Sequence, residues 1–230
     1  MSDATPHIGT LREKPLHAAL KEWYREPDDR VEVPVDGFVI DLVRDDLLIE
    51  IQTRGFASMK TKAHKLLEKG HHLRIVHPIP VDSWIVKIDD AGTIIDRRRS
   101  PKHGQISDVF AELVSFPEAL VRNSLEVEVV LTAEEQIRRH NPGESWRRKG
   151  WTVIERRLVE VMESTLLADA RGLAELLPDG LPETFTTADI AAGLRTPRRA
   201  AQRVAYCLRK TGIADPVGKR GNEVEYRLCR

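Results

Sequence analysis

The fold of this chain is decided by a short stretch, residues 39–52, which reads VIDLVRDDLLIEIQ. Two runs of aliphatic and β-branched residues flank Asp45-Asp46, and this pattern predicts a β-hairpin with a two-residue turn. In that register Asp41 lies directly across from Glu50. Cross-strand partners have Cβ atoms about 4.5–5.5 Å apart, so we expect two carboxyl groups side by side.

The two faces of this hairpin differ in character. Side chains of a strand alternate between faces, so Gln52 shares the face of Glu50. The other face is wholly apolar and is expected to be core: Ile40, Leu42, Ile49 and Ile51. Like charges that face each other destabilise a sheet, so the acid pair requires a proton on one acid or a cation between them. Mg²⁺ suits this place, because it binds few carboxylates and completes its shell with water and phosphate oxygens.

Other interpretations of the acid pair stay open. One strand could be out of register, or Asp41 could lie at a solvated edge of the sheet. A lysine or arginine inside the fold could also neutralise one of the acids; the prediction of a hydrolase would then fail, and a basic nucleic-acid adaptor would remain.

The segments around the hairpin predict a mixed α/β domain. Apolar residues spaced along residues 11–23 indicate a first helix, in which Pro15 fits the first turn. A second helix is expected over residues 58–69, ended by Gly70. Strands are expected over residues 31–35, 38–43, 47–53, 72–77, 84–88, 93–96 and 125–131, and residues 106–114 are expected to be helical.

This order of elements resembles the core of the PD-(D/E)XK nuclease superfamily, over about residues 11–80. The resemblance implies an α/β, restriction-endonuclease-like core, a mixed sheet flanked by helices. It also implies metal-assisted hydrolysis of phosphodiester bonds, in which Asp41, Glu50 and the carbonyl of Ile51 bind Mg²⁺ (or Mn²⁺). Glu13 would be the acid of the first helix and would assist a second ion or its water shell.

Gln52 departs from the family pattern, because the family usually has lysine at this position. Glutamine can hold a water molecule by hydrogen bonds but brings no positive charge. In this resemblance Gln52 orients the attacking water, and Lys60 or Lys62 on the following helix is a candidate for the missing cation. A solvated helix face is the alternative for both lysines.

The end of the chain predicts a second module. Residues 186–194 read as a short helix with a threonine or aspartate cap. Thr196-Pro197 then introduces a helix over about residues 198–211, and residues 213–229 read as a hairpin with a Gly-Lys-Arg-Gly tip. This layout resembles a winged helix-turn-helix, a small α+β domain whose second helix enters the DNA major groove.

The charge distribution supports an anionic partner for this module. The whole chain has 36 basic and 36 acidic side chains, but residues 186–230 carry ten basic against four acidic ones, about +6. The side chains predicted to contact nucleic acid are Arg198, Arg199, Arg203, Lys219 and Arg220.

The sequence therefore predicts residues 1–140 as a nuclease-like domain, 141–185 as a connecting segment and 186–230 as the winged module. The function expected is a Mg²⁺-dependent DNA endonuclease. The alternatives are a catalytically decayed DNA-binding or regulatory protein and a subunit of a multi-protein defence or repair assembly. A cytoplasmic location is expected, because no apolar stretch approaches the ~20 residues of a membrane span and the N-terminus lacks a secretion signal.

Several points stay open in the sequence. It does not tell DNA from RNA, single from double strands, or a specific from a nonspecific cut. A homodimer would suit cleavage of both strands, but the oligomeric state is not encoded in any motif.

Overall fold

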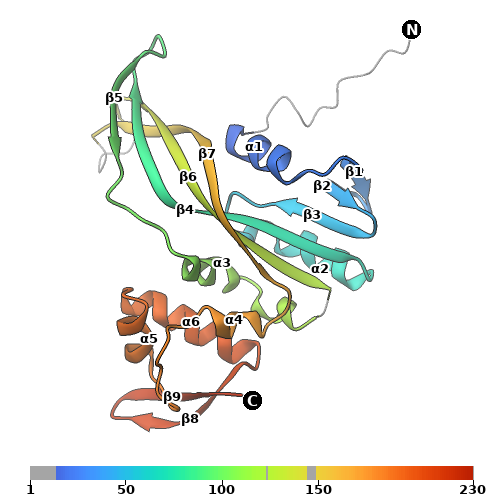
Figure 1. Cartoon of the computed structure of the whole chain (residues 1–230), viewed down its shortest axis with the longest axis vertical. Coiled ribbons are helices and arrows are strands. Elements are labelled where there is room, and N and C mark those ends of the chain that lie inside the picture. Colours follow the sequence, from blue (N-terminus) through green and yellow to red (C-terminus); the bar gives the residue numbers. More distant parts are fainter. Residues whose placement is uncertain (1–13, 123, 144–148, 230) are drawn as a thin grey trace.

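The computed structural model describes residues 14–122, 124–143 and 149–229. Within them one seven-stranded sheet has the order β1-β2-β3-β4-β6-β7, and β5 pairs with β4 (Figure 1). The strands are β1 (Arg30–Val35), β2 (Phe38–Arg44), β3 (Leu47–Ile51), β4 (His72–Ile88), β5 (Ile94–Arg99), β6 (Leu125–His140) and β7 (Trp151–Leu167). The mixed α/β class expected from the sequence is confirmed.

The hairpin that the sequence predicted is formed by β2 and β3. Leu42 pairs with Ile49, Val43 with Leu48 and Arg44 with Leu47, which is the register expected for a two-residue turn. Beyond Leu42 the ladder between these strands ends, whereas β2 continues its pairing with β1 through Ile40 and Val39. The two strands therefore separate at the position of Asp41 and Glu50.

Helices cover both faces of the sheet. Helix α1 (Pro15–Tyr24) places Leu16 and Leu20 in one apolar core, which also holds Leu42, Ile49 and Ile51. Helix α2 (Lys60–Glu68) connects β3 to the parallel strand β4 and packs on the other face. The expectation for Ile40 was wrong in one respect: it is buried in the α2 core, because β2 leaves β3 at this point and follows β1.

The second half of the sheet consists of long strands. β4 and β6 are parallel along almost their whole length, and β7 returns antiparallel to β6 as the edge strand. Residues 141–143, where the sequence placed the domain boundary, belong to the connection between β6 and β7. The connecting segment expected at 141–185 thus contains a 17-residue strand, whose hydrogen bonds to β6 make it part of the main sheet.

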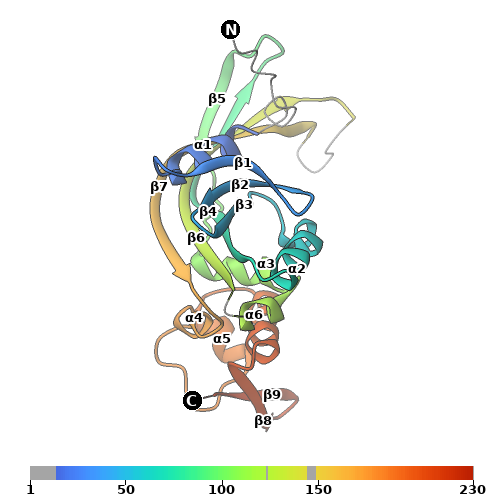
Figure 2. The same cartoon turned by 90° about the vertical axis from the view of Figure 1, so that its right-hand side faces the viewer.

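The C-terminal module follows the end of β7 (Figures 1 and 2). It comprises α4 (Gly172–Glu175), α5 (Thr187–Gly193), α6 (Arg198–Lys210) and the hairpin of β8 (Ala214–Arg220) and β9 (Glu223–Leu228). Thr186 caps α5 by accepting hydrogen bonds from two backbone N–H groups, and Asp189 completes the capping box. An isolated bridge between Phe185 and Tyr226 adds a third extended segment beside the hairpin.

The module and the main body share one apolar core. Short elements of the body, η2 (Phe56–Ser58), η3 (Ile106–Val109), α3 (Phe110–Leu113) and η4 (Pro117–Val121), lie on the face of the sheet that points to α6. Cys207 of α6 is fully buried, with its Sγ 3.9 Å from the carbonyl oxygen of Phe110. Helix α6 is therefore seated on the body by its apolar face.

None of the helices within the described ranges has the length and apolar character that crossing a bilayer demands.

Candidate functional site

Asp41 and Glu50 line one cavity at the point where β2 and β3 separate. The backbone N–H of Ile51 donates a 2.8 Å hydrogen bond to Oδ2 of Asp41, so a side chain replaces the missing rung of the ladder. Both side chains are largely buried, with 18% and 12% of their surface exposed. The cavity has a volume of about 460 Å³ and is bounded also by α1, α2 and the segment after β3.

Asp41 is held in its ionised form. Nε2 of His17, from α1, lies 3.2 Å from Oδ2 of the same carboxylate that accepts the Ile51 N–H. Burial raises the pKa of Asp41, but the hydrogen bonds from His17 and Ile51 and the charge of Lys62 outweigh it and hold that pKa below its ordinary value.

The pKa of Glu50 is shifted in the opposite direction. Burial first, and the charge of Asp41 second, raise its pKa to about 7, although Lys62 acts to lower it. The ammonium group of Lys62, on α2, contacts the Glu50 carboxylate and donates a 2.6 Å hydrogen bond to the carbonyl oxygen of Val39. Two neighbouring acids with pKa values pushed apart are typical of sites that handle protons, although structural ion pairs produce the same signature.

An internal lysine beside one of the acids is the arrangement under which the hydrolase prediction was expected to fail, and Lys62 makes this contact with Glu50. It neutralises one acid without any metal ion. The same contact places the positive charge of Lys62 inside the cavity. Gln52, which is uncharged, cannot supply that charge. Lys60, the other candidate, lies two residues earlier on α2, is exposed and does not line this cavity.

The structure describes only one of the two other residues predicted for the site, Gln52 and Glu13. Gln52 lines the cavity, but its amide nitrogen donates to the carbonyl of Gly55, at 3.1 Å, and to Oγ of Ser58, at 2.9 Å. The amide nitrogen of Gln52 is therefore hydrogen-bonded within the turn after β3. Glu13 lies outside the described residues, and α1 begins at Pro15.

Asp41 and Glu50 are the only two carboxylates that the sequence predicted as metal ligands within the described ranges. No group of three or more histidine, cysteine or acidic side chains there has the arrangement to hold a metal ion. Asp41 and Glu50 nevertheless fit Mg²⁺, which commonly takes one or two carboxylates and retains water in its shell. Lys62 already contacts the Glu50 carboxylate, so a metal ion and this ammonium group would compete for it.

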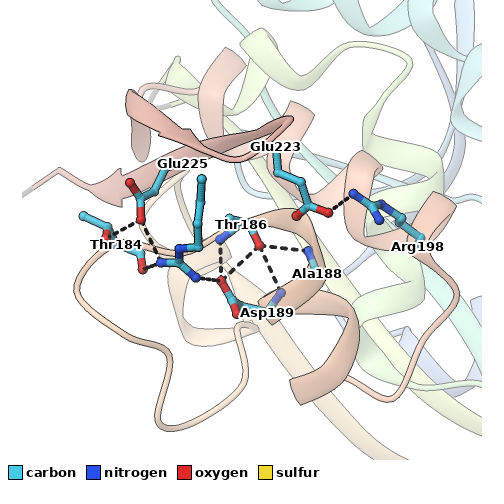
Figure 3. Close-up of polar contacts among 8 residues, drawn as sticks. Thr184, Thr186, Ala188, Asp189, Arg198, Glu223 and Glu225 are labelled. Carbon is cyan, nitrogen blue, oxygen red and sulfur yellow. Dashed lines mark hydrogen bonds and ion pairs between the residues drawn. The ribbon is translucent and has the colours of Figure 1, made fainter.

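The basic residues predicted on the C-terminal module divide into two groups. Arg198 forms an ion pair with Glu223 (Figure 3). Arg220 contacts Asp189 at 3.0 Å and Glu225 at 2.7 Å. These two arginines join the hairpin to α5 and α6. Arg199, Arg203 and Lys219 have no side-chain ion pair to another residue of the described ranges.

Sequence reasoning missed several residues of the site. His17 was not singled out, although it follows the buried Leu16 and lies one turn before Lys21, which also lines the cavity. Arg54 was missed as well; it is exposed directly after β3 and borders the same cavity. The pattern of α1 could have indicated His17, because a polar position beside the apolar stripe of a helix reaches the rim of the sheet.

Comparisons with known proteins add a family but no activity. Residues 14–168 match the family described as "Domain of unknown function (DUF8091)", and this range ends one residue after β7. An "Uncharacterized protein" of Treponema pallidum (strain Nichols) is 32% identical over 222 residues, which cover 96% of this chain and 87% of that protein. No solved structure matches the chain.

Proposed function

The chain belongs to the DUF8091 family, and from the geometry of its acid pair we propose that it is a Mg²⁺-dependent DNA endonuclease of the PD-(D/E)XK type, directed to DNA by a C-terminal winged helix. The observation that carries the proposal is the convergence of Asp41, Glu50 and Lys62 on one open cavity. The two strands and the following helix come in the order expected of the nuclease core, although Lys62 lies on the helix and the family usually has its lysine at the position of Gln52.

The mechanism assigns a distinct role to each side chain. Asp41 and Glu50, with the carbonyl of Ile51, would hold Mg²⁺ (or Mn²⁺), which would lower the pKa of a bound water and offset negative charge at the phosphate. His17 and the Ile51 N–H keep Asp41 ionised and oriented. Lys62 supplies a positive charge beside the scissile phosphate, which Gln52 does not.

The C-terminal module supports the DNA part of the proposal. α5, a tight connection and α6 are followed by a two-stranded hairpin, and the bridge of Phe185 to Tyr226 completes a small sheet. This is the element order of a winged helix. Arg199 and Arg203 on α6 and Lys219 on the hairpin remain for phosphate contacts, which give affinity rather than sequence preference.

One observation favours a second candidate, a nuclease fold that binds DNA without cutting it. Glu50 already has a cationic partner in Lys62, and the amide group of Gln52 is bound to the turn after β3. A site that has lost its metal would be stabilised by such an ion pair.

Cleavage assays with matched variants test the proposal. Purified protein is incubated with single- and double-stranded DNA and RNA in Mg²⁺, in Mn²⁺ and in EDTA. We expect cleavage of DNA that needs the metal and is abolished in Asp41→Asn and Glu50→Gln. Asp46→Asn, in the exposed turn of the same hairpin, is the control and should cut normally.

Folded protein that leaves every substrate intact in both metals would rule out an endonuclease active on its own. Activity that survives in Asp41→Asn would place the chemistry elsewhere.

A further inference from the structure

A second cavity of about 650 Å³ lies between the sheet and α6. Its walls come from β4, β6, β7, η3, α3 and α6. Thr53 and Arg54 line both this cleft and the cavity of the acid pair, so the two spaces adjoin at these residues. We call the larger space the α6 cleft. Figure 1 shows that α3 lies between the sheet and α6 at this place.

Four basic side chains from four separate segments meet in the α6 cleft. They are Arg54 after β3, Lys102 after β5, Arg156 of β7 and Arg203 of α6. Two acidic residues also line the cleft, and backbone groups engage both. Glu112 accepts a 3.0 Å hydrogen bond from the N–H of Phe56, and Asp108 accepts one of 3.2 Å from the N–H of Gln105. These neutral donors orient the two carboxylates but leave their charges in place, so four positive and two negative side chains line the cleft and its net charge is about +2.

Arg156 is held in place by a buried acid. Glu134 is fully buried, and one of its carboxylate oxygens lies 2.9 Å from Nε and 2.7 Å from Nη2 of Arg156. Thr132 donates a 2.8 Å hydrogen bond to the other oxygen. Burial of a carboxylate is costly unless it is paired. Here the pair fixes a guanidinium, one third exposed, at the cleft, which is the pre-organisation that anion binding uses.

Arg203 extends this surface onto the C-terminal module. It is half-buried in the cleft and has no ion-pair partner among the described residues, and Arg199 lies one turn earlier on the same side of α6. Arg203 therefore lies at the edge of the face by which α6 packs on the body, and it lines the α6 cleft.

We propose that the α6 cleft binds the phosphate backbone of a polynucleotide and leads it from the acid pair to α6. The proposal rests on the nuclease function for the identity of the ligand. A polynucleotide is favoured over a single phosphate or a nucleotide, because the basic groups line two adjoining cavities and belong to several segments of the chain. It follows that α6 contacts the same strand that reaches the acid pair, not a distant one.

The test measures binding and not cleavage. Fluorescence anisotropy with a labelled DNA is recorded in EDTA for the wild type, Arg54→Glu, Arg203→Glu and Arg30→Glu. Arg30 is exposed on β1, at the opposite edge of the sheet from β7, and controls for the change of net charge. Both cleft variants should bind about tenfold more weakly or worse, with a log K against log salt slope reduced by about 1 for each lost phosphate contact. Arg30→Glu should bind within about twofold of the wild type.

The failure of this inference is distinguishable from the failure of the nuclease proposal. If the cleft variants and Arg30→Glu lose the same affinity, the cleft is not the path, whether or not the protein cuts DNA. If sodium polyglutamate displaces the DNA as effectively as unlabelled DNA does, an acidic protein is the better partner and the inference is overturned. Selective loss of binding in the cleft variants supports it even in a protein without nuclease activity.

Discussion

Lys62 and Glu50, twelve residues apart in the chain, form an ion pair inside the cavity that also contains Asp41. The pair joins α2 to β3 across the place where the hairpin opens. Because both side chains are more than four-fifths buried, solvent screens their interaction only weakly. The charge state of this pair therefore controls both the stability of the site and its affinity for cations.

The first prediction concerns stability against pH. The pKa of Glu50 is about 7 in the folded protein, against 4.5 for an ordinary glutamate, so the folded state binds more protons between these values. The free energy of unfolding must then fall as pH rises through this window. Glu50→Gln removes the effect, so its stability relative to the wild type should increase by about 2–3 kcal/mol from pH 5 to pH 8.

Urea unfolding at the two pH values measures this difference. Asp46→Asn is the control, and its stability relative to the wild type should be the same at pH 5 and pH 8. An equal effect of Glu50→Gln at both pH values would mean that Glu50 is ionised throughout and that its burial is well compensated.

The second prediction separates the two neighbouring lysines of α2. Lys62→Ala should lower kcat by about 10²-fold, the loss typical of one charge-stabilising group at a reacting centre. Lys60→Ala should leave kcat within about twofold, because Lys60 is exposed outside the cavity. Circular dichroism establishes that both variants are folded, and Lys62→Arg should recover part of the rate. Full activity of Lys62→Ala would show that Lys62 neutralises Glu50 but does not contribute to catalysis.

The hairpin could be predicted from the sequence because its signals are local. Asp45-Asp46 between two aliphatic runs fixes both the turn and the register, and Asp45 adopts the positive φ, 51°, that such a turn requires. The capping box of Thr186 and Asp189 is local in the same way, and the short helix expected at 186–194 appears as α5.

Features that depend on distant partners could not be predicted. The pattern suggested two strands at 72–77 and 84–88, since Pro78 and Pro80 interrupt it. β4 instead continues through them, with a register shift between Pro80 and Asp82. β7 lacks a clean strand pattern in the sequence, because three shifts against β6 break the alternation of its side chains. The partners of Lys62 and Arg220 depend on which elements the fold brings together, and no spacing in the sequence encodes that.

The third prediction distinguishes two adjacent basic residues of the C-terminal hairpin, β8 and β9. Arg220 contacts Asp189, Glu225 and the carbonyl oxygen of Thr184, so Arg220→Ala should lower the melting temperature by loosening the hairpin from α5 (Figure 3). Lys219→Ala should leave the melting temperature unchanged and reduce the salt slope of DNA binding by about 1, because Lys219 is exposed without such partners. The opposite pattern would show that Arg220 is the phosphate contact and that its ion pairs open on binding.

The fourth prediction tests whether α6 stays seated on the body while DNA is bound. Cys207 is fully buried against Phe110, and burial raises the pKa of its thiol to about 12, whereas Cys229 is exposed. The thiolate is the reactive form. Desolvation and the hydrogen bond to Asp215 raise the pKa of the Cys229 thiol, but this side chain is exposed, so a thiol reagent should modify Cys229 in the native protein and Cys207 only after unfolding. Cys229→Ser should therefore show no fast reaction in the native protein.

The same measurement in the presence of DNA decides between two modes of binding. If the α6 cleft binds the strand as the structure stands, α6 need not move, and Cys207 of Cys229→Ser should stay protected when DNA is added in EDTA. If α6 must leave α3 to enter a major groove, its apolar side opens to water and the reaction of Cys207 should accelerate at saturating DNA. Acceleration would contradict the cleft and favour a module that detaches from the body, since the face that holds Cys207 packs against the main core.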